Sequence, residues 1–278
     1  MKPAIKNSAA FFVRPFARAL QPKWNGNEFS FLIITYYKRF ENFQALLKQL
    51  NRWYPAIPKV VFVNGRKDNP EEQQQYLENI KKFLAPFSNI QVKYFEDFIA
   101  PTELWNKGLI AAPTEKVALL NDSVTVTGPF VEQKMLAQPF CKINNSFSNY
   151  IIAKSVIGKI GWFDQNFIAG ASETDGDMEA RIVLAGIPIY VRRSLFITWR
   201  RFENPVVWDK ALGGVIAGKA SQYNNEYFYK KWQFSRAPFA GAKWVPISSG
   251  YIAGPNPGFE TPDPYPDVRK EWQKKYPL

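Results

Sequence analysis

The sequence contains no histidine and only one cysteine, Cys141, among its 278 residues. The absence of histidine excludes Ser-His-Asp and Cys-His catalytic arrangements, His-ligated zinc and imidazole acid–base chemistry. Any proton transfer must therefore fall to Asp, Glu, Lys or Tyr. A single cysteine also excludes an intrachain disulfide and a cysteine-ligated metal cluster, and it fits a reducing, cytoplasmic compartment.

Long apolar runs are also absent. No stretch approaches the roughly 20 apolar residues that a membrane-spanning helix requires. The segment before Lys23 is basic, has no acidic residue and is interrupted by Pro15, so it lacks the apolar region of a signal peptide. We therefore expect a cytoplasmic protein whose basic arm, residues 1–27, is either solvated or rests on the cytoplasmic membrane face.

The rest of the composition is that of a globular protein. Hydrophobic residues make up 46% and charged residues 22%, which excludes a disordered tail, a fibre or a coiled coil. Lys and Arg number 36 against 24 Asp and Glu, so the formal net charge is +12. The basic residues are spread along the chain without a recognised nucleic-acid-binding module, so no nucleic acid partner is expected.

Strand and helix patterns alternate over the first half of the chain. Short apolar runs predict buried strands, and apolar residues at helical spacing predict helices between them. The predicted strands are 30–36, 59–64, 90–95 and 117–120, and the predicted helices are 43–54, 71–84 and 103–112. This alternation predicts a βαβ arrangement with a parallel sheet.

The second half is more mixed. It predicts strands at 149–153 and 187–191, with helices at 153–160 and 177–185. Beyond Pro205 the chain is rich in proline and aromatic residues, and we expect this irregular extension to bury its rings against the core. The predicted organisation is the arm 1–27, a main domain 28–202 and a packed extension 203–278.

Polar residues follow three of the predicted strands. They form the segments Thr35-Tyr36-Tyr37, Asn64-Gly65 and Asn121-Asp122-Ser123. Ligands of open α/β sheets bind outside the carboxyl ends of the strands. Each segment alone can also be an ordinary turn, but three at successive strand ends favour a binding site.

Five segments carry a family resemblance. In their order along the chain, they resemble motifs of the family 2 glycosyltransferases: Phe31–Leu50, Leu104–Gly108, Leu119–Val126, Ile160–Phe167 and Asp175–Gly186. Tyr227–Trp232 resembles a further segment of some members. The resemblance implies an α/β GT-A-type, Rossmann-like mixed sheet flanked by helices. It also implies transfer of a sugar, with inversion, from a UDP-, GDP- or dTDP-linked donor to a glycan or lipid-linked acceptor, as in polysaccharide biosynthesis.

The resemblance also implies site residues. It places nine residues at the donor: Thr35, Tyr36, Tyr37, Arg39, Asn64, Asn106, Lys107, Asn121 and Asp122. A tyrosine ring can stack on the base, and the guanidinium of Arg39 matches a diphosphate. At the acceptor it places Trp162 and Asn149, although Trp162 also fits a core position.

The implied metal site departs from the family pattern. The family holds Mn²⁺ or Mg²⁺ with two carboxylates of an Asp-x-Asp site, whereas this chain offers Asp122 and Ser123. Oxygen ligands are what such hard cations prefer. With one carboxylate instead of two, metal dependence stays open.

The implied general base lies in the Asp175–Gly186 segment. Asp175 is the candidate that takes the acceptor hydroxyl's proton, with Glu173 and Asp177 as alternatives. Asp175 or Asp177 also fits the cap of a helix, where an acidic residue suits the helix dipole. Arg181 is expected to pair with one of these carboxylates.

Other function classes stay open. The altered Asp122 segment also fits a degenerate transferase that binds a nucleotide-sugar without turnover. The net charge also fits a non-enzymatic basic binding protein. A nucleotidyltransferase is disfavoured because the first predicted strand is not followed by a glycine-rich loop.

Overall fold

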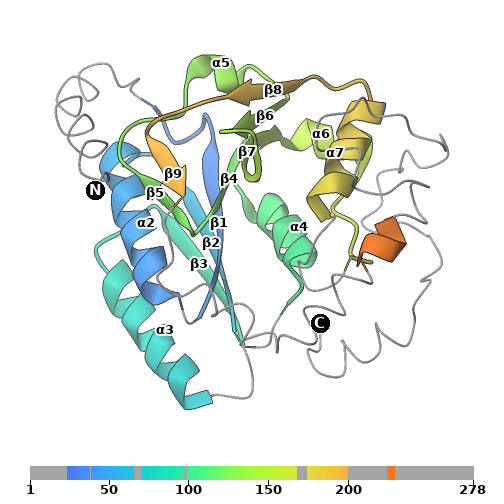
Figure 1. Cartoon of the computed structure of the whole chain (residues 1–278). Helices are drawn as coiled ribbons and strands as arrows, with labels where there is room; N and C mark the ends of the chain where they lie inside the picture. Colours follow the sequence, from blue (N-terminus) through green and yellow to red (C-terminus); the bar gives the residue numbers. More distant parts are fainter. Residues whose placement is uncertain are drawn as a thin grey trace, which may run out of the picture.

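The computed structural model describes residues 24–37, 39–65, 70–96, 99–167, 174–199 and 224–228. Its centre is a seven-stranded sheet with the strand order β3-β2-β1-β4-β7-β6-β8, flanked by helices (Figure 1). The sheet comprises β1 (Ser30–Tyr36), β2 (Lys59–Asn64), β3 (Ile90–Phe95), β4 (Lys116–Asn121), β6 (Phe140–Ile143), β7 (Ser146–Ala153) and β8 (Ile189–Arg192). A second, two-stranded sheet pairs β5 (Val124–Val126) with β9 (Ile197–Trp199). The helices are α2 (Phe40–Trp53), α3 (Pro70–Leu84), α4 (Pro101–Ala111), α5 (Gln133–Leu136), α6 (Lys154–Ile160) and α7 (Thr174–Leu184), with a short helix at 224–228.

The first half of the sheet is parallel, as predicted. β1 pairs in parallel with β2 and β4, and β2 pairs in parallel with β3. β1 and β2 are buried almost throughout because helices cover both faces of the sheet. In chain order the strands are added outward from β1 through β2 to β3. The chain then crosses to the other side of β1, where it forms β4. The topological switch point, where ligands of such sheets bind, therefore lies between β1 and β4.

The second half of the sheet is mainly antiparallel, which confirms the mixed α/β sheet. β7 runs antiparallel to both β4 and β6, and β6 runs parallel to β8. Asn144 and Asn145 connect β6 to β7 with φ angles of 54° and 56°. Two successive positive φ angles make a hairpin turn whose twist matches the strands, and asparagine tolerates this backbone better than most residues.

Two apolar layers hold the helices to the sheet. α2 and α3 cover one face, whereas α4, α6 and α7 lie over the other (Figure 1). α2 buries an apolar stripe at helical spacing made of Phe43, Leu46, Leu47, Leu50 and Trp53. Each such side chain contributes about 1.5–3 kcal/mol when it is fully buried.

A glycine brings α4 close to the sheet. A Cβ atom added at Gly108 would lie 2.5 Å from a methyl carbon of Leu32 on β1. Any larger residue would push the helix away from the strand. This close approach is a physical reason for glycine at the end of the Leu104–Gly108 motif.

Part of the C-terminal region packs on the main domain. Tyr227 and Phe228, in the helix at 224–228, are buried, and the ring of Tyr227 lies 4.9 Å from that of Phe167. The other aromatic residues of the extension 203–278 and most of the basic arm lie outside the described residues. None of the described helices is long and apolar enough to cross a membrane.

Candidate functional site

A polar cluster joins the carboxyl ends of β1 and β4 at the switch point. The hydroxyl of Thr35 donates to Oδ2 of Asp122 at 2.6 Å. Nη1 of Arg39, just before α2, pairs with Oδ1 of Asp122 at 2.8 Å. The side chain of Asp122 is only 1% exposed. Three residues predicted at the donor are therefore in direct contact.

Burial and pairing act in opposite directions on Asp122. Burial raises the pKa of this carboxyl above its ordinary value, while the Arg39 guanidinium and the Thr35 hydroxyl lower it. Removing either partner of a buried ion pair leaves an uncompensated charge, which is strongly destabilising. Asp122 and Arg39 therefore act as one unit.

Neighbouring polar groups extend this cluster to β7. Oδ1 of Asn121 accepts hydrogen bonds from the backbone N–H and the hydroxyl of Ser123. The oxygen of that hydroxyl in turn accepts from Nη2 of Arg39 at 3.1 Å. Oδ1 of Asn149, on β7, accepts from the backbone N–H of Asn121 at 3.0 Å. Asn149 thus positions the end of β4, and its contact with an acceptor stays a prediction.

The two predicted base-stacking tyrosines are buried. Tyr36 and Tyr37 are 4% and 2% exposed, and their ring centroids lie 4.7 Å apart. Tyr37 also packs edge-on against Tyr76 of α3. Burial raises the pKa of the Tyr76 hydroxyl, and the nearby charge of Asp122 adds to this rise. Tyr76 therefore lies near Asp122, and stacking of Tyr36 or Tyr37 on a base stays a prediction.

Two predicted donor-binding amides hold backbone segments. The side chain of Asn64 donates to the carbonyl of Ile99 and accepts from its N–H, both at 2.8 Å. Asn106 of α4 makes the same paired contact with the backbone of Phe163, at 2.9 Å each way. Both amides therefore position segments around the site, and direct contact with a donor stays a prediction.

Lys107 and Trp162 lie at the periphery. Lys107 is 43% exposed and pairs with Glu103 one helical turn earlier, at 3.1 Å. The ring of Trp162 packs, partly buried, against the apolar layer that contains α4. Neither residue contacts the Asp122 cluster through an interaction found among the described residues, and their predicted roles remain predictions.

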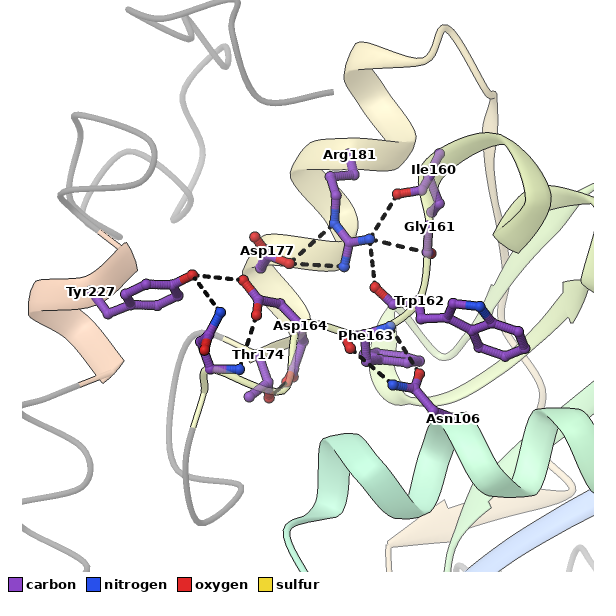
Figure 2. A network of polar contacts seen from close by, with 12 residues as sticks. Asn106, Ile160, Gly161, Trp162, Phe163, Asp164, Thr174, Asp177, Arg181 and Tyr227 are labelled. Carbon is purple, nitrogen blue, oxygen red and sulfur yellow. Dashed lines mark hydrogen bonds and ion pairs between the residues drawn. The ribbon is translucent and has the colours of Figure 1, made fainter. Parts of the chain in front are cut away.

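A buried arginine organises the start of α7 (Figure 2). Arg181 donates from Nε and Nη2 to Oδ2 of Asp177, at 3.1 and 2.8 Å. Its Nη1 donates to the carbonyls of residues 160, 161 and 162. The predicted pairing of Arg181 with a carboxylate is therefore confirmed, and Asp177 is engaged in holding α7 to the preceding loop.

Asp164 was not singled out by the sequence reasoning. It is buried, and its two oxygens accept from the hydroxyl of Tyr227 at 2.9 Å and the N–H of Asn166 at 2.9 Å (Figure 2). Both Asp164 and Tyr227 lie in segments that carry the family resemblance. The two residues are 63 positions apart in the sequence, so no local pattern could predict their contact. The two motifs that contain them were the only available indication.

Of the two candidate bases that the structure describes, Asp175 is more accessible than Asp177. Its side chain is half-buried in the first turn of α7, and Oδ1 accepts from the Thr174 hydroxyl at 3.0 Å. Burial raises the pKa of the Tyr150 hydroxyl, and the charge of Asp175 adds to that rise, so the two groups are near each other. Tyr150 follows Asn149 on β7, beside the end of β4. Glu173 lies outside the described residues.

The residues at Asp122 do not fit a divalent metal ion. Both oxygens of Asp122 and the hydroxyl of Ser123 are bound to neighbours, one of which is the positively charged Arg39. Mg²⁺ and Mn²⁺ need several oxygen ligands free to turn toward them. Among the described residues, no group of three or more Asp, Glu, His or Cys side chains is placed to hold a metal ion.

Comparison with known proteins yields only distant structural similarity. No family model and no curated protein matches the sequence. Similar solved structures include S. aureus TarS, with 14% identity, a TM-score of 0.47 and coverage of 75% of this chain but only 44% of that chain. TarS 1-349 gives 14% identity, a TM-score of 0.45 and coverage of 79% and 76%.

A third similar structure is the mannosyltransferase PcManGT from Pyrobaculum calidifontis in complex with GDP-Man and Mn²⁺. It has 11% identity, a TM-score of 0.49 and coverage of 84% of this chain and 75% of that chain. Similarity at this level assigns no function. The strand order of the chain itself defines its fold class.

Proposed function

We propose that this protein is a GT-A-type glycosyltransferase that moves a sugar from a nucleotide-sugar to a glycan or lipid-linked acceptor. The observation that carries the proposal is the Thr35–Asp122–Arg39 cluster at the switch point between β1 and β4. A ligand of an open α/β sheet binds at this place, and a guanidinium there suits a diphosphate. The resemblance of five ordered motifs to family 2 glycosyltransferases supports a sugar donor over other phosphate ligands.

Asp175 is the proposed general base. It takes the proton of the acceptor hydroxyl while that oxygen attacks the anomeric carbon, and the nucleoside diphosphate leaves from the opposite face. One such displacement inverts the anomeric centre. Asp177 is unsuited to this task because its Oδ2 is bound twice by Arg181. The half-buried carboxylate of Asp175 remains able to turn toward a substrate.

A panel of nucleotide-sugars with candidate acceptors tests the proposal through release of nucleoside diphosphate. Asp175→Asn should lower the rate of transfer by about 100-fold or more, while donor affinity stays unchanged. Glu78→Gln, which alters an exposed carboxylate on α3, is the matched control and should transfer at the normal rate. Full turnover by Asp175→Asn would show that Asp175 is not the general base.

A second candidate is a protein that binds the donor without turnover. It is favoured by the full engagement of Asp122 and Ser123 with neighbouring side chains. The same panel separates the two candidates. Thermal stabilisation by a nucleotide-sugar without any product supports the binding protein, whereas no response to any nucleotide rejects both.

A further inference from the structure

The candidate metal position at Asp122 contains a guanidinium. Nη1 of Arg39 lies 2.8 Å from Oδ1 of Asp122, and Nη2 lies 3.1 Å from Oγ of Ser123. One fork therefore bridges the two side chains that the sequence indicates as metal ligands. The remaining carboxylate oxygen accepts from the hydroxyl of Thr35 at 2.6 Å.

The other oxygen ligands near this position are also engaged. The Ser123 hydroxyl donates to Oδ1 of Asn121, which accepts the backbone N–H of Ser123 as well, at 2.9 Å. To receive a divalent cation, Asp122 and Ser123 would both have to release Arg39. The displaced guanidinium would then face a cation of like charge at short range.

The charge at this site differs from that of a pair of carboxylates. Asp122 and Arg39 together are neutral, whereas two carboxylates would carry two negative charges. A hard divalent cation is attracted by anionic oxygens. The neutral Asp122–Arg39 pair therefore attracts such a cation only weakly. The side chain of Arg39 is 17% exposed, so it is not completely enclosed by the fold.

We propose that Arg39 stands in the place of the metal ion, so that the diphosphate of the donor binds at this sheet edge without a divalent cation. This inference rests on the proposed function, since it assumes a nucleotide-sugar donor. The planar guanidinium donates paired hydrogen bonds to phosphate oxygens, and its orientation is set in advance by Asp122 and Ser123. Asp122 is then a positioning residue for Arg39.

Calorimetric titration of UDP, GDP and dTDP into the full chain tests this inference. Each titration is done once with EDTA and once with excess MnCl₂. We expect at least one nucleotide to bind in EDTA with a Kd within about twofold of that in Mn²⁺. Binding that requires Mn²⁺ overturns the inference and leaves the proposed function standing, whereas no binding in either condition overturns both.

Variants at position 39 test whether the positive charge of Arg39 binds the diphosphate of the nucleotide. Arg39→Gln should weaken binding in EDTA by about tenfold or more, and Arg39→Lys should weaken it less because the charge is retained. Arg52→Gln, at the exposed far end of the same helix, is the matched control and should bind like the unaltered chain. Equal affinity of Arg39→Gln and the unaltered chain would overturn the inference.

Direct binding of Mn²⁺ gives a readout without nucleotide. The electron paramagnetic resonance signal of free Mn²⁺ should stay unchanged when the unaltered chain is added. The double variant Arg39→Gln with Ser123→Asp frees Asp122 and adds a second carboxylate, so it should reduce the free Mn²⁺ signal. Binding of Mn²⁺ by the unaltered chain that is lost in Asp122→Asn would contradict the inference.

Discussion

Lys59 shows how a single residue makes the stability of this fold depend on pH. Its ammonium, buried at the start of β2, donates to the carbonyls of Tyr54 and Ile57 at 2.6 and 2.8 Å and to Oδ1 of Asn51 at 3.3 Å. These contacts fix the chain that leads from α2 into β2. Burial nevertheless lowers the pKa of Lys59 to about 7, because an ammonium away from water is disfavoured.

We predict that the free energy of unfolding rises with pH between about 7 and 10.4, the ordinary pKa of lysine. In this window the unfolded chain still holds the Lys59 proton and the folded chain has released it, so higher pH favours the folded state. The slope from this single proton should reach about 1.4 kcal/mol per pH unit at most. Urea unfolding at several pH values measures it.

The contribution of Lys59 is isolated by comparison with a variant. Lys59→Met should lose this part of the slope, while Lys48→Met, which removes an exposed lysine of α2, should keep it. If the profile of Lys59→Met is as steep as that of the unaltered chain, the slope belongs to other groups.

The sequence indicated most of the residues at the candidate site but not their contacts. Thr35 and Asp122 were predictable because polar residues that end buried apolar strands are easily recognised. Arg39 was recognised only as a cation near the donor, and its bond to Asp122 depends on β1 and β4 lying side by side. The side chains of Asn64 and Asn106 bind backbone groups of distant segments. Nothing in the sequence around either residue predicts these hydrogen bonds.

At the scale of elements, one buried side chain links the start of α7 to the end of α6. The fully buried guanidinium of Arg181 joins Asp177 of its own helix to carbonyls at the C-terminal end of α6 and just beyond it. The end of α7 is defined separately by Gly186, whose φ of 67° allows the chain to turn away. Because Asp175 lies in the first turn of α7, this attachment also sets where Asp175 stands.

Arg181→Lys is therefore expected to lower the free energy of unfolding by about 2–3 kcal/mol. A lysine carries the charge but cannot reach the carboxylate and three carbonyls from one nitrogen. Chemical denaturation followed by circular dichroism measures the loss. Lys134→Gln, which breaks an exposed pair with Glu132, is the control and should cost about 0.5 kcal/mol or less. A similar small cost for Arg181→Lys would mean that the network adds little.

The strands differ in how well the sequence predicted them. β1, β2 and β3 have the predicted bounds because buried parallel strands appear as continuous apolar runs. β6 was missed because Lys142 interrupts its apolar pattern, and the charge of Lys142 is matched by Glu179 of α7 at 2.6 Å. β5 and β9 were missed because each is three residues long and forms only by pairing with the other.

For the whole molecule, the net charge of +12 is the most unusual property. Anionic lipid headgroups attract nearby basic segments by about 1 kcal/mol per residue, and salt screens this attraction. We propose that the basic arm adds contact with an anionic membrane surface to the transferase function. The cations concerned are Lys2, Lys6, Arg14, Arg18 and Lys23.

Changing these five residues to glutamine should reduce binding to phosphatidylserine vesicles by about tenfold or more at low salt. Co-sedimentation measures the bound fraction. The control changes five exposed cations elsewhere, which lowers the net charge equally: Lys48, Arg52, Lys81, Lys82 and Lys159. Equal losses in both variants would assign the binding to overall charge and not to the arm.

The hydrogen bond between Thr35 and Asp122 also has a consequence for the order of folding. It joins residues 87 positions apart, and the strands that carry them pair only after the intervening β2 and β3 units have been made. Contacts between distant positions form slowly, because a long loop must close before they stabilise anything. During synthesis, the polar cluster at the carboxyl ends of β1 and β4 therefore forms late. A chain halted before β4 can contain a partly built sheet but lacks the Thr35–Asp122 contact.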